Sequence, residues 1–152
     1  MYLKKVLEKY KDKKIKIFVD MDGVIADYDF GVASNYDKKR PLKESINKLR
    51  KISKMNNIKL YILSISRKTI GVSEKNYWLD KYAPFFKKEN RIIISKEESD
   101  IKQSSIIKAN YLRDLKRDGS IIVVIDDDPL ILKEISNLSD DAILLKDSVL
   151  VD

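Results

Sequence analysis

Short runs of apolar and β-branched residues alternate along this chain with stretches of helical periodicity. The runs with strand character cover residues 15–19, 58–63, 91–94, 121–125 and 142–145. Parallel strands need crossover connections, usually helices, so this alternation predicts a parallel sheet with helices on both faces. We therefore expect an α/β fold, a three-layer α/β/α sandwich whose central parallel sheet has about five strands.

The stretches between these strands carry apolar residues at the spacing of one helix face. They predict helices over residues 1–12, 41–54, 73–82 and 100–119, and from 129 onward. We expect Pro41 to occupy the first turn of its helix, Asp100 to cap the fourth helix and Gly119 to end it. Residues 27–41 lie largely outside these elements and predict a flap over the sheet edge.

The chain of 152 residues has the size of one domain, and no Pro-, Gly- or Ser-rich linker divides it. We expect a single domain over residues 1–152. The longest strongly apolar run, residues 121–125, is far shorter than the roughly 20 apolar residues of a membrane-spanning helix. The first residues also lack the apolar segment of a signal peptide, so we expect a soluble, cytoplasmic protein without a membrane partner.

The composition excludes several kinds of chemistry, because the chain contains 0 Cys and 0 His. Disulfide frameworks, cysteine-based metal sites, thiolate nucleophiles and Ser-His-Asp triads are all ruled out. Acid–base chemistry then falls to carboxylates, Lys or Tyr, and a bound metal would have oxygen ligands, which favours Mg²⁺. The formal net charge of +7 mildly favours an anionic partner.

Polar residues of one chemical kind follow three of the predicted strands. Asp20 and Asp22 follow the first, Ser64 follows the second, and Asp126 and Asp127 follow the fourth. Sites in open α/β sheets form beyond the carboxyl ends of the strands, so we expect these five side chains to share a pocket. Four carboxylates so close together repel one another unless a cation lies among them, which again indicates Mg²⁺.

Asp20 and Asp22 are separated by one residue and would share a face in extended backbone. Gly23 allows the chain to turn directly afterwards and lets a ligand approach the backbone closely. One of the two carboxylates can attack phosphorus while the other passes a proton to the leaving oxygen and later takes one from water. The pair therefore predicts phosphoryl chemistry on a carboxylate nucleophile.

Four segments resemble, in order along the chain, the four motifs of the haloacid dehalogenase superfamily. FVDMDGVIADYD (residues 18–29) is similar to motif I, YILS (61–64) to motif II, SEKNYWLDKY (73–82) to the lysine region of motif III, and IIVVIDDDP (121–129) to motif IV. The first and third segments look most like the 5'(3')-deoxyribonucleotidase branch. The resemblance implies a single catalytic domain of that superfamily, in which residues 27–41 form a flap or vestigial cap. It leaves no room for a separate cap domain.

The resemblance also implies a role for each matching residue. Asp20 matches the nucleophile that becomes an aspartyl-phosphate, and Asp22 matches the general acid/base, whose main-chain carbonyl also binds Mg²⁺. Asp127 matches the metal ligand and Asp126 its supporting neighbour. The implied metal site therefore draws on Asp20, Asp22, Asp126 and Asp127, with Mg²⁺ as the cofactor.

Phosphate binding and substrate contact are implied for three further positions. Ser64 matches the hydroxyl that hydrogen-bonds the phosphoryl oxygens, and Lys75 matches the cation that neutralises them. Lys102, at the start of the predicted fourth helix, is the competing candidate for this lysine. Tyr28 matches an aromatic residue that faces the substrate base, whereas Trp78 is expected to pack in the core.

These roles imply an Mg²⁺-dependent phosphomonoester hydrolase, with a 5'-nucleotidase-like phosphatase acting on a small phosphorylated substrate, a nucleotide, as the first choice. A nucleic-acid 3'- or 5'-end phosphatase, or a phosphoprotein phosphatase, is the alternative, because a site without a cap also admits large substrates. A catalytically idle, phosphate-binding regulatory module is the alternative from another class. A signalling receiver domain fits poorly, since its acidic residues occur in a different order along the chain.

Overall fold

The computed structural model describes residues 2–28, 36–138 and 141–151. Its five strands form one sheet in the order β3-β2-β1-β4-β5, and every neighbouring pair is parallel. The α/β fold class predicted from the sequence is therefore confirmed. The strands are β1 (Ile15–Val19), β2 (Ile58–Ser66), β3 (Arg91–Ser95), β4 (Ile121–Asp126) and β5 (Ala142–Lys146).

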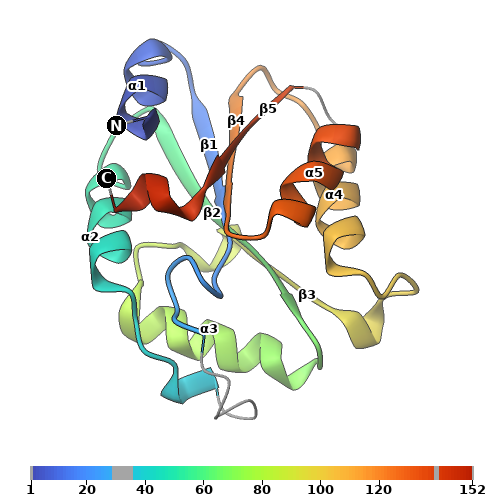
Figure 1. Ribbon diagram of the computed structural model, residues 1–152. Helices are drawn as coiled ribbons and strands as arrows, with labels where there is room; N and C mark the ends of the chain where they lie inside the picture. Colours follow the sequence, from blue (N-terminus) through green and yellow to red (C-terminus); the bar gives the residue numbers. More distant parts are fainter. Residues whose placement is uncertain (1, 29–35, 139–140, 152) are drawn as a thin grey trace.

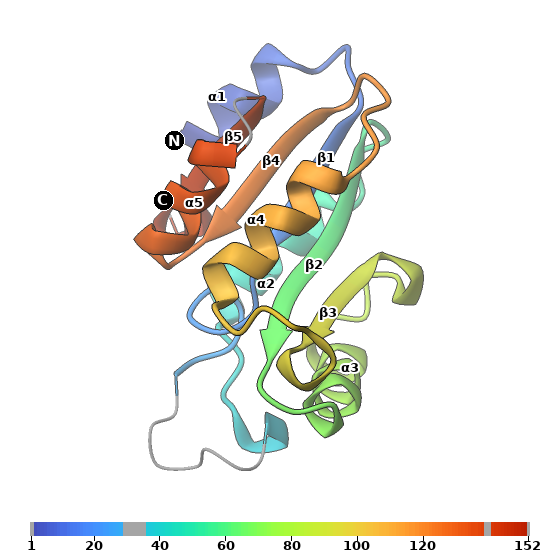
Figure 2. The same ribbon diagram turned by 90° about the vertical axis from the view of Figure 1, so that its right-hand side faces the viewer.

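Helices cover both faces of this sheet (Figure 1). They are α1 (Tyr2–Lys9), α2 (Lys43–Ile52), α3 (Ile70–Tyr82), α4 (Ser104–Asp114) and α5 (Pro129–Leu138). One apolar core joins α1, α2 and α3 to the sheet, and a second joins α4 and α5 to the opposite face. Figure 2 shows α4 and α5 side by side on that second face. No helix among the described residues is long and apolar enough to cross a membrane.

The central strand β1 explains why these segments fold as buried strands. Ile17 and Val19 face the core beneath α1 to α3, while Phe18 between them faces the core beneath α4 and α5. Phe18 stacks on Tyr61 of the neighbouring strand with ring centroids 4.7 Å apart. A strand buried on both faces favours apolar residues at most positions, which is why four of the five residues of β1 are apolar; Lys16, near its start, pairs with Asp118 instead.

The predicted end of the second strand and the predicted start of the third helix were wrong, both at the carboxyl edge of the sheet. Strand β2 does not stop before Ser64 but continues to Ser66, because Ser64 and Ser66 pair with β3 opposite Ile93 and Ser95. Helix α3 begins at Ile70, so it is longer at its N-terminal end than predicted. Ser64 therefore lies inside a strand, buried between its neighbours, and not in the loop that follows.

The predicted roles of three helix-end residues were also wrong. Helix α4 begins at Ser104, so Asp100 does not cap it, and it ends at Asp114, well before Gly119. Gly119 has a φ of +87° and lies in the turn that leads into β4. Pro41 lies before α2 and forms an isolated bridge with Ala26 instead of opening the helix.

The segment predicted as a flap, residues 27–41, is described only in part, and residues 29–35 lie outside the described residues. Its second half contains the 3-10 helix η1 (Tyr36–Lys38), which packs on α3. Tyr36 meets the fully buried ring of Trp78 edge to face, and the Trp78 indole nitrogen donates to the Lys39 carbonyl oxygen at 3.0 Å. Trp78 is a core residue, as predicted, and it fixes Lys39 near the carboxyl edge of the sheet.

Candidate active site

A pocket of about 1000 Å³ opens at the carboxyl ends of the strands. Its walls come from the turn after β1, the end of β2 with the first turns of α3, the end of β3, the inner face of α4, and the loop between β4 and α5. Asp20, Asp22, Lys75 and Asp127 line it, together with Tyr28. These residues come from three distant stretches of the chain. Ser64 and Asp126, which the sequence assigns to the same pocket, do not line it; they are buried and contact the lining residues Lys75 and Lys108.

The turn after β1 presents Asp20 and Asp22 to this pocket. The Asp20 amide donates to the Ile125 carbonyl oxygen at 3.0 Å, so the pairing of β1 with β4 continues up to the first aspartate. The chain then turns tightly: the Met21 carbonyl oxygen accepts from Ile25 and Ala26. The turn holds both carboxylates against the ends of the neighbouring strands.

Gly23 is the residue that makes this turn possible. Its φ is +79°, a left-handed conformation that residues with a side chain rarely adopt. A Cβ atom at this position would also overlap the Asp127 carboxylate and the Tyr28 ring. The motif therefore needs glycine both for the turn and for the close approach of Asp127.

Three carboxylates form a compact oxygen cluster at the base of the pocket. Asp20, Asp126 and Asp127 each offer an oxygen within 4.8 Å of the others. Burial raises the pKa of Asp20 from 3.8 to about 6, against the opposing effect of Lys108, and burial also raises the pKa values of Asp126 and Asp127. Negative charge is thus crowded here, and oxygen donors at this spacing suit a hard divalent cation.

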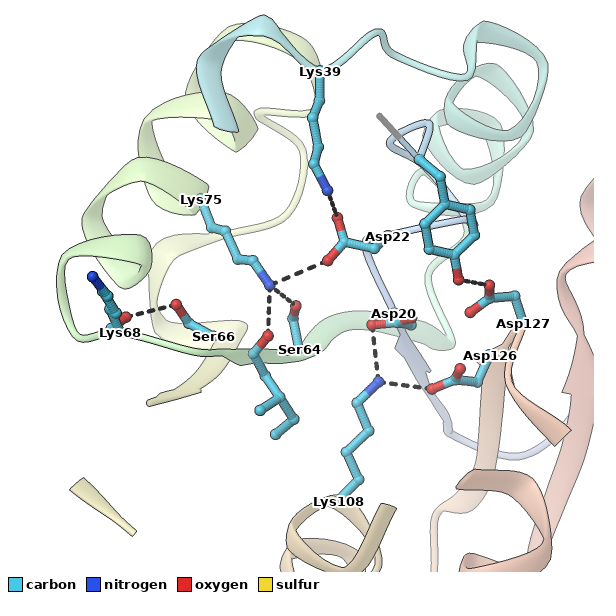
Figure 3. Close-up of polar contacts among 12 residues, drawn as sticks. Asp20, Asp22, Lys39, Ser64, Ser66, Lys68, Lys75, Lys108, Asp126 and Asp127 are labelled. Carbon is cyan, nitrogen blue, oxygen red and sulfur yellow. Dashed lines mark hydrogen bonds and ion pairs between the residues drawn. The ribbon is translucent and has the colours of Figure 1, made fainter. Parts of the chain in front are cut away.

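Lys108 is a pocket residue that the sequence did not single out. Its ammonium nitrogen lies 2.9 Å from Asp20 Oδ1 and 2.7 Å from Asp126 Oδ2 (Figure 3). The side chain is almost fully buried. Burial lowers its pKa, but the two carboxylates outweigh burial and raise it, so Lys108 is charged.

A helical-spacing signal could have identified this lysine. Lys108 precedes Leu112 by four residues, and both lie on the buried face of α4. The competing candidate, Lys102, instead donates to the carbonyl oxygens of Lys96 and Ser99 at 2.7 and 2.8 Å. Lys102 is not among the residues that line the pocket.

Lys75 occupies the other side of the pocket, where the sequence places a phosphate-binding cation. Its ammonium group donates to Ser64 Oγ at 2.7 Å and to the Ile65 carbonyl oxygen at 2.8 Å, and it lies 3.5 Å from Asp22 Oδ2. Burial lowers the pKa of Lys75, an effect that Asp22 opposes. Lys75 and Ser64 therefore form a preformed pair beside the predicted general acid/base, visible in Figure 3.

Asp22 is held by a second cation, which comes from the flap segment. Lys39 Nζ lies 2.6 Å from Asp22 Oδ1. Burial raises the pKa of Asp22, but Lys75 and Lys39 together outweigh burial and hold the pKa below 3.8. The Asp22 carboxylate thus lies between two lysines and outside the oxygen cluster formed by the other three aspartates.

Tyr28 contacts the oxygen cluster directly. Its hydroxyl donates to Asp127 Oδ2, although the tyrosine as a whole is half exposed. Asp128, by contrast, caps α5: its Oδ1 accepts from the Leu130 amide at 2.9 Å, as its place before Pro129 predicts. The structure therefore places Tyr28 against a predicted metal ligand and gives Asp128 a purely structural contact.

No family model and no curated protein sequence matches the chain. Its fold is similar to that of several chains in solved structures, among them the two described next. A chain in the structure of a "Pnkp1/Rnl/Hen1 complex" gives a TM-score of 0.66 at 17% identity over 88% of this chain and 46% of that one. A chain in the "Pnkp1/Rnl/Hen1 RNA repair complex" gives 0.65 at 17% identity over 89% and 43%. At this identity the likeness shows a shared fold, and the chain spans less than half of either neighbour.

Proposed function

We propose that this protein is an Mg²⁺-dependent phosphomonoester hydrolase of the haloacid dehalogenase type, working through an aspartyl-phosphate on Asp20. One observation carries the proposal: Asp20 lies both in the oxygen cluster with Asp126 and Asp127 and in contact with the buried cation Lys108. A structural turn would not need a buried nucleophile beside a cation site. Phosphoryl transfer needs both, since it depends on positioning and on neutralising charge.

The residues present fit the metal that this proposal implies. Asp20, Asp126 and Asp127 would hold Mg²⁺, since all three offer carboxylate oxygens and crowd negative charge at one point. The main-chain carbonyl of Asp22 would complete the protein's share of the ligands. Bound there, the ion would neutralise charge on the phosphoryl oxygens and on the nucleophile.

The chemical steps fall to side chains of this chain. An Asp20 carboxylate oxygen attacks phosphorus, and the bond from phosphorus to the leaving oxygen breaks as protonated Asp22 gives that oxygen a proton. Without substrate, Lys75 and Lys39 lower the pKa of Asp22; phosphoryl oxygens bound to Lys75 would offset its charge and favour the protonated form. Lys75 and Ser64 bind the phosphoryl oxygens, and Lys108 holds Asp20 in place. Asp22 then takes a proton from water, which attacks the same phosphorus, so that inorganic phosphate leaves and the Asp20 carboxylate is restored.

A nucleoside monophosphate is the first substrate class to test, because the motif resemblance leads to nucleotidases. A nucleic-acid 3'- or 5'-phosphate end is the second. Two observations favour it: the pocket, at about 1000 Å³, is at the upper end of the usual range for small-molecule sites, and the solved structures with this fold include one described as an RNA repair complex.

Phosphate release from p-nitrophenyl phosphate and from a nucleotide panel, with Mg²⁺ or with EDTA, tests the proposal. We expect turnover that EDTA abolishes and that Asp20→Asn lowers at least a thousandfold without loss of the fold. Binding of Mg²⁺ should raise the melting temperature of the wild type, and Asp127→Asn should weaken that shift. Asp128→Asn is the matched control, since asparagine still caps α5.

Full activity of Asp20→Asn would overturn the proposal. A wild type that binds Mg²⁺ and inorganic phosphate but releases none from any substrate would instead support an idle phosphate-binding module. Circular dichroism of each variant separates loss of activity from loss of fold.

A further inference from the structure

The outer part of the pocket carries positive charge that the proposed chemistry does not use. Arg67 and Lys68 follow β2, and Lys96 follows β3; all three line the same pocket as Asp20. We call these three residues the outer basic cluster. A terminal phosphate bound at Lys75 and Ser64 would not require them.

The outer basic cluster is held in place by the sheet. Ser66 pairs with Ser95 in the parallel register of β2 and β3, so Arg67 and Lys96 are each the first residue beyond one of two neighbouring strands. Thr69 Oγ1 lies 3.1 Å from Ser95 Oγ and ties the two loops together. The three cations therefore form one surface and are not independent loop residues.

The outer basic cluster forms no close ion pair. In the described part of the chain, neither Arg67, Lys68 nor Lys96 has a carboxylate oxygen within 4.0 Å. Glu74 lines the same pocket, and the hydrogen bond from the Thr69 amide at 3.0 Å, followed by Lys68, lowers the pKa of Glu97. By contrast, Lys39, Lys75 and Lys108 are all paired with aspartates of the site.

The phosphate site and the outer basic cluster are neighbours along the chain. Ser64 lies within β2, which ends at Ser66, and Arg67 is the next residue, in the wall of the pocket. The exposed side chain of Ile70 lines the same pocket and offers apolar surface for a sugar or base. A nucleoside monophosphate carries one phosphate and would leave the cluster unmatched.

We infer that the outer basic cluster binds the phosphodiester next to the terminal phosphate, so that the preferred substrate is a phosphate-terminated single-stranded oligonucleotide. This inference rests on the proposed phosphatase activity of the same pocket. It assigns Arg67, Lys68 and Lys96 to the selection of substrate and not to the reaction itself.

The test compares dinucleotides that carry a terminal 5'- or 3'-phosphate with the corresponding nucleoside monophosphates and with p-nitrophenyl phosphate. We expect the wild type to prefer one of the phosphorylated dinucleotides. The triple variant Arg67→Gln/Lys68→Gln/Lys96→Gln should lower the ratio of kcat/KM for that dinucleotide to kcat/KM for p-nitrophenyl phosphate at least tenfold. It should also weaken the salt dependence of dinucleotide turnover, because phosphate contacts release counterions.

The matched control removes the same charge elsewhere. Lys4, Lys5 and Lys9 are exposed on α1, which leads into the opposite end of β1. Their triple glutamine variant should leave the ratio of kcat/KM values unchanged. The inference would be overturned if the ratio fell equally in both triple variants, or if it fell in neither. It would also be overturned if the wild type preferred a phosphopeptide and the cluster variant lost that preference.

A binding measurement separates this inference from the proposed function. If the wild type hydrolyses no phosphomonoester, the proposed function fails. Fluorescence anisotropy of a labelled, phosphate-terminated oligonucleotide, in the Asp20→Asn background, then decides the role of the cluster. Binding weakened at least tenfold by the triple cluster variant supports it, and unchanged binding overturns it.

Discussion

Lys108 reaches from α4 to Asp20 at the end of β1, with its ammonium nitrogen 2.9 Å from Asp20 Oδ1. The same nitrogen lies 2.7 Å from Asp126 Oδ2. The contact fixes the direction of the proposed nucleophile and offsets the mutual repulsion of two buried carboxylates. It also makes the fold depend on a cation in the interior, since each partner would be left unpaired without the others.

We predict that Lys108→Met lowers kcat/KM for p-nitrophenyl phosphate by about 10²- to 10³-fold, the usual loss when one charge-stabilising group is removed. The free energy of unfolding in EDTA should fall by about 3 kcal/mol, because Asp20 and Asp126 lose their buried counter-charge. Steady-state kinetics and urea denaturation measure the two effects.

Two other lysines serve as controls for Lys108. Lys116→Met changes an exposed lysine just beyond α4 and should alter neither quantity beyond about 0.5 kcal/mol or twofold. Lys102→Met tests the lysine that the sequence offered as an alternative, and we expect it to retain most of the activity. A Lys108→Met enzyme more active than Lys102→Met would contradict the assignment.

The acidic part of the site was predictable because buried strands can be recognised in the sequence as runs of apolar residues. Asp20, Asp126 and Asp127 directly follow or end continuous apolar runs, and parallel strands bring their carboxyl ends to one edge. Lys108 has no such marker. It is one of 31 basic residues, and its one signal, the four-residue spacing to the buried Leu112, does not by itself show that a lysine faces inward.

The end of β2 shows that a polar residue after an apolar run does not always mark the end of a strand. Ser64 looks like the end of a strand, yet it lies inside one at 1% exposure, where Lys75 donates to its hydroxyl. Pairing with β3 carries the strand on to Ser66. Tertiary contacts, which the local sequence does not encode, determine both the burial of Ser64 and the true end of β2. For the same reason, the sequence does not predict that Lys39 pairs with Asp22.

The raised pKa of Asp20 predicts a pH-dependent stability in the absence of metal. The pKa is about 6 in the folded protein against an ordinary 3.8, chiefly because the carboxyl group is buried. The unfolded chain gives up this proton first, so the free energy of unfolding falls as pH rises from about 4 to about 6. Asp20→Asn removes this loss and should be more stable than the wild type at pH 7.5, by on the order of 2 kcal/mol.

Urea denaturation in EDTA at pH 4.5 and pH 7.5 measures this difference. The advantage of Asp20→Asn should be small at pH 4.5 and large at pH 7.5, while the variant stays inactive at both. Addition of Mg²⁺ should reduce the advantage, because it stabilises the wild type more strongly. If the variant were less stable than the wild type at pH 7.5 in EDTA, burial of the ionised Asp20 carboxylate would not destabilise the folded protein.

A substitution of Tyr28 shows whether this residue binds the substrate or positions a metal ligand. Its hydroxyl donates to Asp127 Oδ2, and this hydrogen bond helps to keep Asp127 ionised. We predict that Tyr28→Phe raises the Mg²⁺ concentration needed for half-maximal activity by about tenfold, as the loss of a partner of a metal ligand does. The KM for a nucleotide at saturating Mg²⁺ should change much less. The opposite pattern, a raised nucleotide KM with unchanged Mg²⁺ dependence, would favour the base-facing role that the motif resemblance implies.

Gly23 and Gly119 form a matched pair that separates backbone strain from steric overlap. Both have a left-handed φ, +79° and +87°, but a Cβ atom at Gly119 meets nothing within 4 Å, whereas one at Gly23 overlaps Asp127 and Tyr28. Gly119→Ala should therefore lower the free energy of unfolding by only about 1 to 2 kcal/mol and leave kcat intact. Gly23→Ala adds displacement of Asp127 to the same strain, so it should lose more stability and at least a hundredfold in kcat/KM at fixed Mg²⁺. Equal effects of the two alanines on activity would mean that the approach of Asp127 to the turn does not matter for catalysis.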